Sequence, residues 1–126
     1  MDYKVELLRL GLNLCQDNII RDSKHHPKCP NTIFEDLLKR QQDGETLNTE
    51  EYNLYGSCVM SLTEILLNSR MMKYQSVDIK DDVRTEGYLA ILTQLPRYFD
   101  RTRGSTSYSY RISRLIHHGR SRARKA

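Results

Sequence analysis

Long apolar runs are missing from this chain of 126 residues. A transmembrane helix needs roughly 18 or more consecutive apolar residues, so we expect no membrane contact. The first ten residues carry four charges, where a signal peptide would need an uncharged apolar block. Cysteine is scarce, and three irregularly spaced thiols do not make a disulfide framework. We therefore expect a cytoplasmic protein with reduced cysteines.

Catalytic motifs are missing as well. The chain has no Gly-rich phosphate loop, no HExxH and no paired CxxC. His25, His26 and Cys29 could together supply three metal ligands, but a structural zinc site takes four and no partner cysteine lies nearby. We expect no active site, no metal and no cofactor, and hence a protein that is not an enzyme.

Acidic residues nearly vanish from the C-terminal end. Residues 97–126 hold eight arginines and one lysine against Asp100, a net charge of +8, whereas the whole chain carries only +4. Residues 1–96 therefore sum to −4. This asymmetry suggests two partners of opposite charge, with nucleic acid at the basic end. The alternative is that residues 119–126 form a disordered solubilising tail.

Helical periodicity dominates the chain, and alternation of the strand type is nearly absent. The pattern predicts an all-α fold, a compact bundle of about five helices with a basic C-terminal helix and tail. Helices are expected over residues 3–22, from Thr32 to about 40, from Asn48 or Thr49 to Met71, over 79–95 before Pro96, and from Ser105 or Thr106 onward. The expected caps are Thr32 with Glu35, Asn48 with Glu51, and Asp78. The apolar positions at helical spacing are Val5, Leu8, Leu12, Cys15, Ile19, Ile33, Phe34, Leu37, Leu38, Tyr52, Tyr55, Val59, Leu62, Ile65, Leu66, Leu67, Val83, Leu89, Ile91, Leu92, Leu95, Tyr108, Ile112, Leu115 and Ile116.

Aromatic and basic residues interleave near the C-terminus. Tyr108 and Tyr110 alternate with Arg111 and Arg114. Single-stranded DNA binding needs this arrangement, because bases stack on rings while guanidinium groups neutralise phosphates. The alternative is that some of the aromatic residues, Tyr98 and Tyr108 among them, belong to the core.

One ordered motif resembles a known family. The pattern D-x-x-x-E-G from Asp82 to Gly87 is followed by an aromatic–acid–basic–Gly loop and an S/T-x-S/T-Y helix. This order resembles region 2 of the primary (sigma-70) bacterial sigma factor family, best over residues 78–116 and more weakly back to Asn48. In length the chain is most similar to the reduced late-promoter sigma factors of tailed bacteriophages. It departs from the family in having no tryptophan, where the family has tandem tryptophans in the last helix. We expect no second DNA-binding domain, and the end of the chain is basic, whereas the late sigma factors of phages often end in an apolar tail.

The resemblance implies two sets of site residues. Contacts to the β′ clamp helices of core bacterial RNA polymerase are expected from Asp82, Thr85, Glu86, Tyr88 and Leu92. Contacts to the non-template strand of a −10 promoter element are expected from Tyr98, Arg101, Arg103, Tyr108, Tyr110, Arg111, Arg114, His117, His118 and Arg120. A co-activator is a further candidate partner, and the compartment would be the bacterial host cell if a phage encodes the chain.

The resulting prediction is a minimal sigma factor that binds core polymerase and melts a −10-like element. Residues 1–47 would be an accessory helical segment, 48–119 the region-2-like bundle and 120–126 a basic tail. Two alternatives stay open: a polymerase-binding regulator that does not read DNA, and a general nucleic-acid-binding protein.

Overall fold

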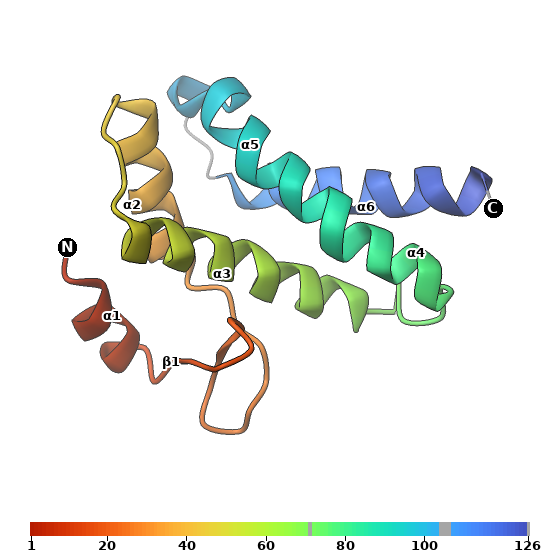
Figure 1. The fold of residues 1–126 in the computed structure, drawn as a ribbon, viewed down its shortest axis with the longest axis horizontal. Coiled ribbons are helices and arrows are strands. Elements are labelled where there is room, and N and C mark those ends of the chain that lie inside the picture. Colours follow the sequence, from red (N-terminus) through yellow and green to blue (C-terminus); the bar gives the residue numbers. More distant parts are fainter. Residues whose placement is uncertain (71, 104–106, 126) are drawn as a thin grey trace. The chain divides into compact units, whose positions relative to one another are not determined.

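The computed structural model describes residues 1–70, 72–103 and 107–125 (Figure 1). Within them, helices predominate and the only strands form one two-stranded hairpin, so the predicted all-α class is confirmed. The chain divides into two compact units, Met1–Leu62 and Thr63–Ala126. This division falls inside a helix, and the boundary between residues 47 and 48 stays a prediction of the sequence.

The first unit begins with a shorter helix than the sequence predicts. Helix α1 covers only Tyr3–Arg9, and the hairpin of β1 (Asn13–Leu14) and β2 (Ile20–Arg21) follows it. Gly11 and Asn18 have positive φ angles of 71° and 65°, which end the helix and turn the hairpin. The helix predicted over residues 3–22 is therefore wrong beyond Arg9.

The burial in this segment also differs from the prediction. Leu7 and Leu12 are buried, whereas Val5 and Leu8 are 59% and 75% exposed. With the helix stopped at Arg9, the spacing from Leu8 to Leu12 no longer marks one helical face.

Helices α2 (Asn31–Gln42) and α3 (Thr49–Leu67) supply the core of the first unit. The ring of Phe34 stacks on the ring of Tyr55, with centroids 4.7 Å apart. The four predicted core positions of α2 are all fully buried: Ile33, Phe34, Leu37 and Leu38. Thr32 does not cap this helix, because Pro30 is the cap residue and Thr32 lies in the first turn.

The predicted capping box of α3 is confirmed. The Glu51 N–H donates to Asn48 Oδ1 at 2.8 Å, and the Asn48 N–H donates to Glu51 Oε1 at 3.0 Å. The helix ends at Leu67, before the expected Met71, which lies outside the described residues. Ile65 is half-buried and Tyr52 is 42% exposed, so these two are not the core positions that the spacing suggested.

One arginine links the polar ends of the helices in this unit. Arg40 Nε donates to Glu45 at 2.7 Å, and its Nη1 donates to the Tyr3 hydroxyl at 2.9 Å and to Glu51. The hydrogen bond from Arg40, followed by the Asn48 N–H, lowers the pKa of the Glu51 carboxyl below its ordinary value of 4.5. Burial is the main cause that raises the pKa of the Tyr3 hydroxyl.

We expect the Glu51 carboxylate to make stability depend on acid pH. Because its folded-state pKa is lowered, its contribution is present above about pH 4.5 and is lost as pH falls through the folded-state pKa. The Tm of Glu51→Gln should therefore fall less steeply than that of wild type below about pH 4.5. The control is Glu50→Gln, which removes a carboxylate whose partner, Lys4, is exposed. Equal acid slopes for Glu51→Gln and wild type would contradict the assignment.

The second unit is built on one long helical run. Helix α4 (Val77–Asp82) continues through the π-helical turn η1 (Val83–Gly87) into α5 (Tyr88–Tyr98), and Figure 1 shows the run as one rod. The 3-10 turn η2 (Arg101–Arg103) and helix α6 (Tyr108–Lys125) follow, and α6 packs against α4, η1 and α5.

The ends of this run differ from the prediction. The Ser76 hydroxyl, not Asp78, caps α4 by accepting from the Ile79 N–H at 3.3 Å. Pro96 lies inside α5 rather than ending it. Proline has no N–H, so the helix lacks the hydrogen bond that residue 96 would otherwise donate to the Leu92 carbonyl. The expected caps Ser105 and Thr106 lie outside the described residues.

The spacing of buried residues explains the π-helical turn. The buried stripe consists of every fourth residue: Ile79, Val83, Gly87, Ile91 and Leu95. In a regular α-helix a spacing of four drifts by about 40° at each step. The wider π turn offsets this drift, so the stripe keeps facing the core. Leu89, halfway between Gly87 and Ile91, is left on the opposite side and is 54% exposed. Its predicted burial is wrong.

Candidate functional sites

The acidic face consists of Asp82, Thr85 and Glu86, at the end of α4 and on the π turn. Thr85 and Glu86 are exposed and Asp82 is half-buried. Residues three and four apart are neighbours on a helix surface, so the three side chains belong to one face. The Thr85 hydroxyl donates to the Asp81 carbonyl at 3.0 Å, which directs the threonine along the helix. These three predicted partner contacts therefore lie together.

Arg84, which lies between Asp82 and Glu86 in the sequence, pairs with two other acids. Arg84 Nε donates to Glu64 Oε1 at 2.7 Å, and Arg84 Nη1 donates to Asp81 Oδ1 at 2.9 Å. The hydrogen bond to Glu64 is the main cause that raises the pKa of Arg84. These contacts fix the Arg84 guanidinium toward Glu64 and Asp81.

The last two predicted partner contacts differ in exposure. Tyr88 is half-buried, but Leu92 is only 8% exposed. A side chain that packs in the core offers almost no surface to a partner, so the structure does not support Leu92 as a contact.

The most exposed predicted DNA contacts lie around the turn between α5 and α6. Tyr98 and Tyr108 are 68% and 41% exposed, and Arg101 is exposed. The Asp100 carboxylate accepts from the N–H and the hydroxyl of Thr102, at 2.9 and 2.5 Å, which orders the start of η2. The two rings and the guanidinium are groups that can stack on bases and meet phosphates.

Helix α6 adds further predicted contacts. Tyr110 is half-buried and meets Phe99 edge to face, with centroids 6.1 Å apart. Arg114 is exposed and donates to Gln94 Oε1 at 3.0 Å, and His117 is exposed. The side chains of Arg103, His118 and Arg120 lie outside the described part of the chain.

Arg111 is the clear correction in this set. Its side chain is fully buried, and its guanidinium carbon lies 5.6 Å from the centroid of the Tyr108 ring. A cation over an aromatic face is a stabilising contact. Arg111 is therefore part of the packing beneath the predicted DNA contacts and does not face outward.

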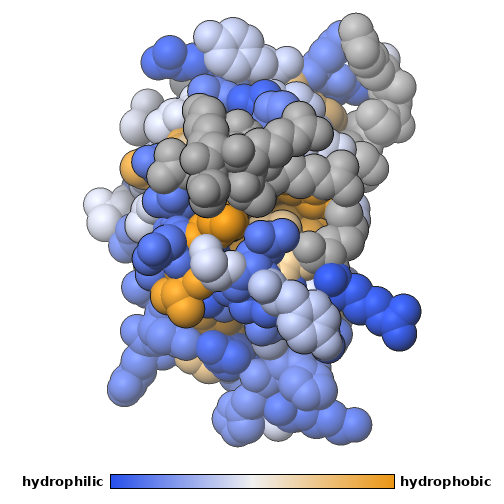
Figure 2. Space-filling view, turned by 90° about the vertical axis from the view of Figure 1, so that its right-hand side faces the viewer, coloured by the Kyte–Doolittle hydropathy of each residue, from blue (hydrophilic) through white to orange (hydrophobic). Residues whose placement is uncertain are grey.

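Figure 2 shows one face of the molecule by hydropathy. Among its coloured atoms, hydrophilic side chains predominate and hydrophobic ones are visible as separate spots.

The histidines and cysteine of the first unit do not form a metal site in the structure. Among the described residues, no group of three or more His, Cys, Asp or Glu side chains could hold a metal ion. His25 and His26 are exposed, and the Cys29 thiol lies 3.7 Å from Asn31 Oδ1, its hydrogen-bond acceptor.

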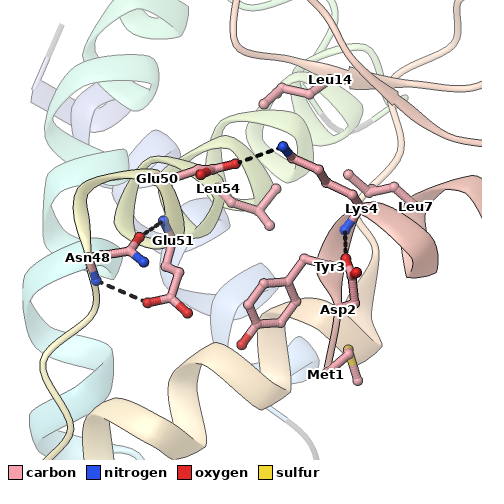
Figure 3. Close-up of a pocket in the computed structure, with 10 residues that line it drawn as sticks. All are labelled: Met1, Asp2, Tyr3, Lys4, Leu7, Leu14, Asn48, Glu50, Glu51 and Leu54. Carbon is pink, nitrogen blue, oxygen red and sulfur yellow. Dashed lines mark hydrogen bonds and ion pairs between the residues drawn. The ribbon is translucent and has the colours of Figure 1, made fainter.

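A pocket of about 410 Å³ lies beside α1 and the start of α3 (Figure 3). It combines an apolar wall with three carboxylates. Asp2 accepts from the Lys4 N–H at 3.0 Å, Glu50 pairs with Lys4 Nζ at 3.5 Å, and Glu51 accepts from Asn48 and Arg40. Because each carboxylate already has a protein partner, the pocket does not single out a ligand. Its lining residues are Met1, Asp2, Tyr3, Lys4, Leu7, Leu14, Asn48, Glu50, Glu51 and Leu54.

Comparisons with family models, with curated proteins and with solved structures found no match. No helix in the described ranges has the length and apolar character to cross a bilayer. Any function must therefore be argued from the chain's own residues.

Proposed function

We propose that this chain is a minimal sigma factor, which binds core bacterial RNA polymerase and opens a −10-like promoter element. The observation that carries the proposal is the arrangement of the second unit. An exposed acidic face on the π turn is followed, along the same chain segment, by exposed aromatic and basic side chains at the α5–α6 turn. Their order is the order of the resemblance over residues 78–116.

The acidic face accounts for the polymerase side of the proposal. Asp82 and Glu86 would meet basic side chains of the β′ clamp helices. Charge-assisted hydrogen bonds to carboxylates are among the stronger polar contacts, and complementary charge speeds association and rejects wrong partners.

The α5–α6 turn accounts for the DNA side. Unstacking a base costs a few kcal/mol, and stacking on an aromatic ring returns about 1–3 kcal/mol per base. Tyr98 and Tyr108 supply two exposed rings, and Arg101 and Arg114 supply phosphate contacts. With no tryptophan in the chain, tyrosine or arginine takes the part of the wedge in this proposal.

The test is reconstitution with core bacterial RNA polymerase on a library of DNA fragments. The expected result is a stable complex that starts transcription at discrete sites sharing an A/T-rich element. Binding without any start site would favour a polymerase-binding regulator. Nucleic-acid binding of equal strength with and without polymerase would favour a general binder, and either outcome would overturn the proposal.

A further inference from the structure

The π turn places one leucine next to the acidic face. Leu89 lies four residues after Thr85 and three after Glu86, the separations at which helix side chains are neighbours. It is 54% exposed although it lies inside the continuous run Val77–Tyr98 and not at a frayed end. The run therefore presents an apolar side chain beside Thr85 and Glu86, at the C-terminal edge of the acidic face.

This placement follows from the helix geometry. The buried stripe uses every fourth residue from Ile79 to Leu95, and Leu89 lies on the opposite side from Gly87 and Ile91. Rotating Leu89 inward would rotate the stripe outward, so the leucine cannot be buried within the unit without repacking it. Leu92, the apolar contact predicted from the sequence, is instead part of the core.

A partner for this face needs more than charge. Exposed ion pairs contribute little to affinity, whereas a few side chains packed into desolvated pockets near the centre of an interface carry most of it. An apolar side chain next to acidic groups offers both parts of a usual interface, a desolvated apolar part and a polar rim.

We propose that Leu89 is the apolar anchor of the acidic face. The surface it meets on the clamp helices of core polymerase then carries an apolar side chain flanked by basic ones. Asp82 and Glu86 select and orient the basic groups, and Leu89 is buried against the partner next to Glu86 and slows dissociation. This inference rests on the proposed function.

The chain offers a matched control. Leu8 on α1 is also an exposed leucine, at 75%, and lies in the first unit. Leu8→Ala and Leu89→Ala remove the same atoms from two exposed positions. Both variants should keep the wild-type circular dichroism spectrum and Tm, because exposed side chains contribute little to folding.

The experiment measures binding and dissociation of full-length protein on immobilised core polymerase. Leu89→Ala should weaken binding by about tenfold or more, mainly through faster dissociation, and Leu89→Met should recover most of the affinity. Leu8→Ala should stay within about twofold of wild type, since isolated surface positions are close to neutral. The Leu89→Ala loss should persist at high salt, because burial of apolar surface is not screened.

The outcomes separate the inference from the proposed function. If wild type binds and charge reversal of Asp82 and Glu86 abolishes binding, but Leu89→Ala binds like wild type, the anchor is refuted and the sigma-type docking survives. If Leu8→Ala and Leu89→Ala weaken binding equally, the effect is not specific to the acidic face and the inference is overturned. If wild type does not bind core polymerase, both fail.

Discussion

The double variant Asp82→Lys with Glu86→Lys should lose detectable binding to core RNA polymerase. Each substitution replaces a carboxylate by an ammonium group, so two expected attractions become repulsions against the basic clamp helices. Like-charge juxtaposition in an interface costs several kcal/mol, and about 4 kcal/mol lowers affinity roughly a thousandfold. Co-elution of protein and polymerase in size-exclusion chromatography measures the effect, and unchanged co-elution would refute the acidic face as a docking surface.

The control for this result is a charge reversal of the same size in the first unit. Asp43→Lys with Glu50→Lys changes the net charge equally at two exposed positions, and the Glu50–Lys4 pair that it breaks joins side chains that are 77% and 82% exposed. This variant should retain binding. Loss of binding in both double variants would show that net charge, not the acidic face, governs association. The polymerase binding of Asp82→Asn with Glu86→Gln should fall between that of wild type and that of the charge reversal. Because this variant introduces no new charge at half-buried position 82, it distinguishes the effect of charge on binding from an effect on folding.

Local chemistry explains the parts of the fold that the sequence could predict. The capping box of Asn48 and Glu51 involves residues three apart, and both of its hydrogen bonds form. The four apolar residues of α2 all pack inward because a single helical stripe needs no information from elsewhere in the chain. Caps and stripes of this kind are contained in a window of a few residues.

The hairpin was not predictable from spacing, because the apolar residues before and within it still fit a helix. Two backbone positions decide the outcome. Gly11 and Asn18 both take positive φ, and each breaks a helical pattern that the neighbouring apolar residues would otherwise continue. Asparagine tolerates this conformation better than most residues, so Asp17–Asn18 was a usable turn signal.

The candidate partner site was only partly predictable from the sequence. The motif from Asp82 to Gly87 identified the stretch, but not which apolar residue faces outward. The spacing of four that runs from Ile79 to Leu95 was readable in the sequence and indicated a turn wider than an α-helix. Leu89 lies two residues before Ile91, about 200° round a regular α-helix, so the expectation that Leu89 is buried did not follow from the spacing.

The burial of Arg111 could not be predicted, since it depends on tertiary packing. Arginines in a basic helix are usually exposed, and nothing in the order of Tyr110, Arg111 and Arg114 distinguishes one arginine from the other. The structure separates them: Arg111 is fully buried near the Tyr108 ring, and Arg114 is exposed beside Gln94. The two arginines should therefore have different effects when truncated.

Arg111→Ala should destabilise the fold, and Arg114→Ala should weaken DNA binding. Truncating a large buried side chain leaves a cavity and removes its packing, so Arg111→Ala is expected to lower the free energy of unfolding by about 2 kcal/mol or more. An exposed truncation such as Arg114→Ala should stay within about 0.5 kcal/mol. Urea unfolding of both variants measures this difference.

Promoter binding by the complex with polymerase, titrated with salt, should show the reverse order: Arg114→Ala has an effect and Arg111→Ala has none. Arg114→Ala should reduce the slope of log K against log salt by about one unit, the value for one lost phosphate contact, whereas Arg111→Ala should leave the slope unchanged under conditions where it is folded. Arg111→Met should recover stability by refilling the space without restoring charge. A reduced salt slope with unchanged stability in Arg111→Ala would instead mean that Arg111 reaches DNA, and that the packing around Tyr108 opens when the protein binds a promoter.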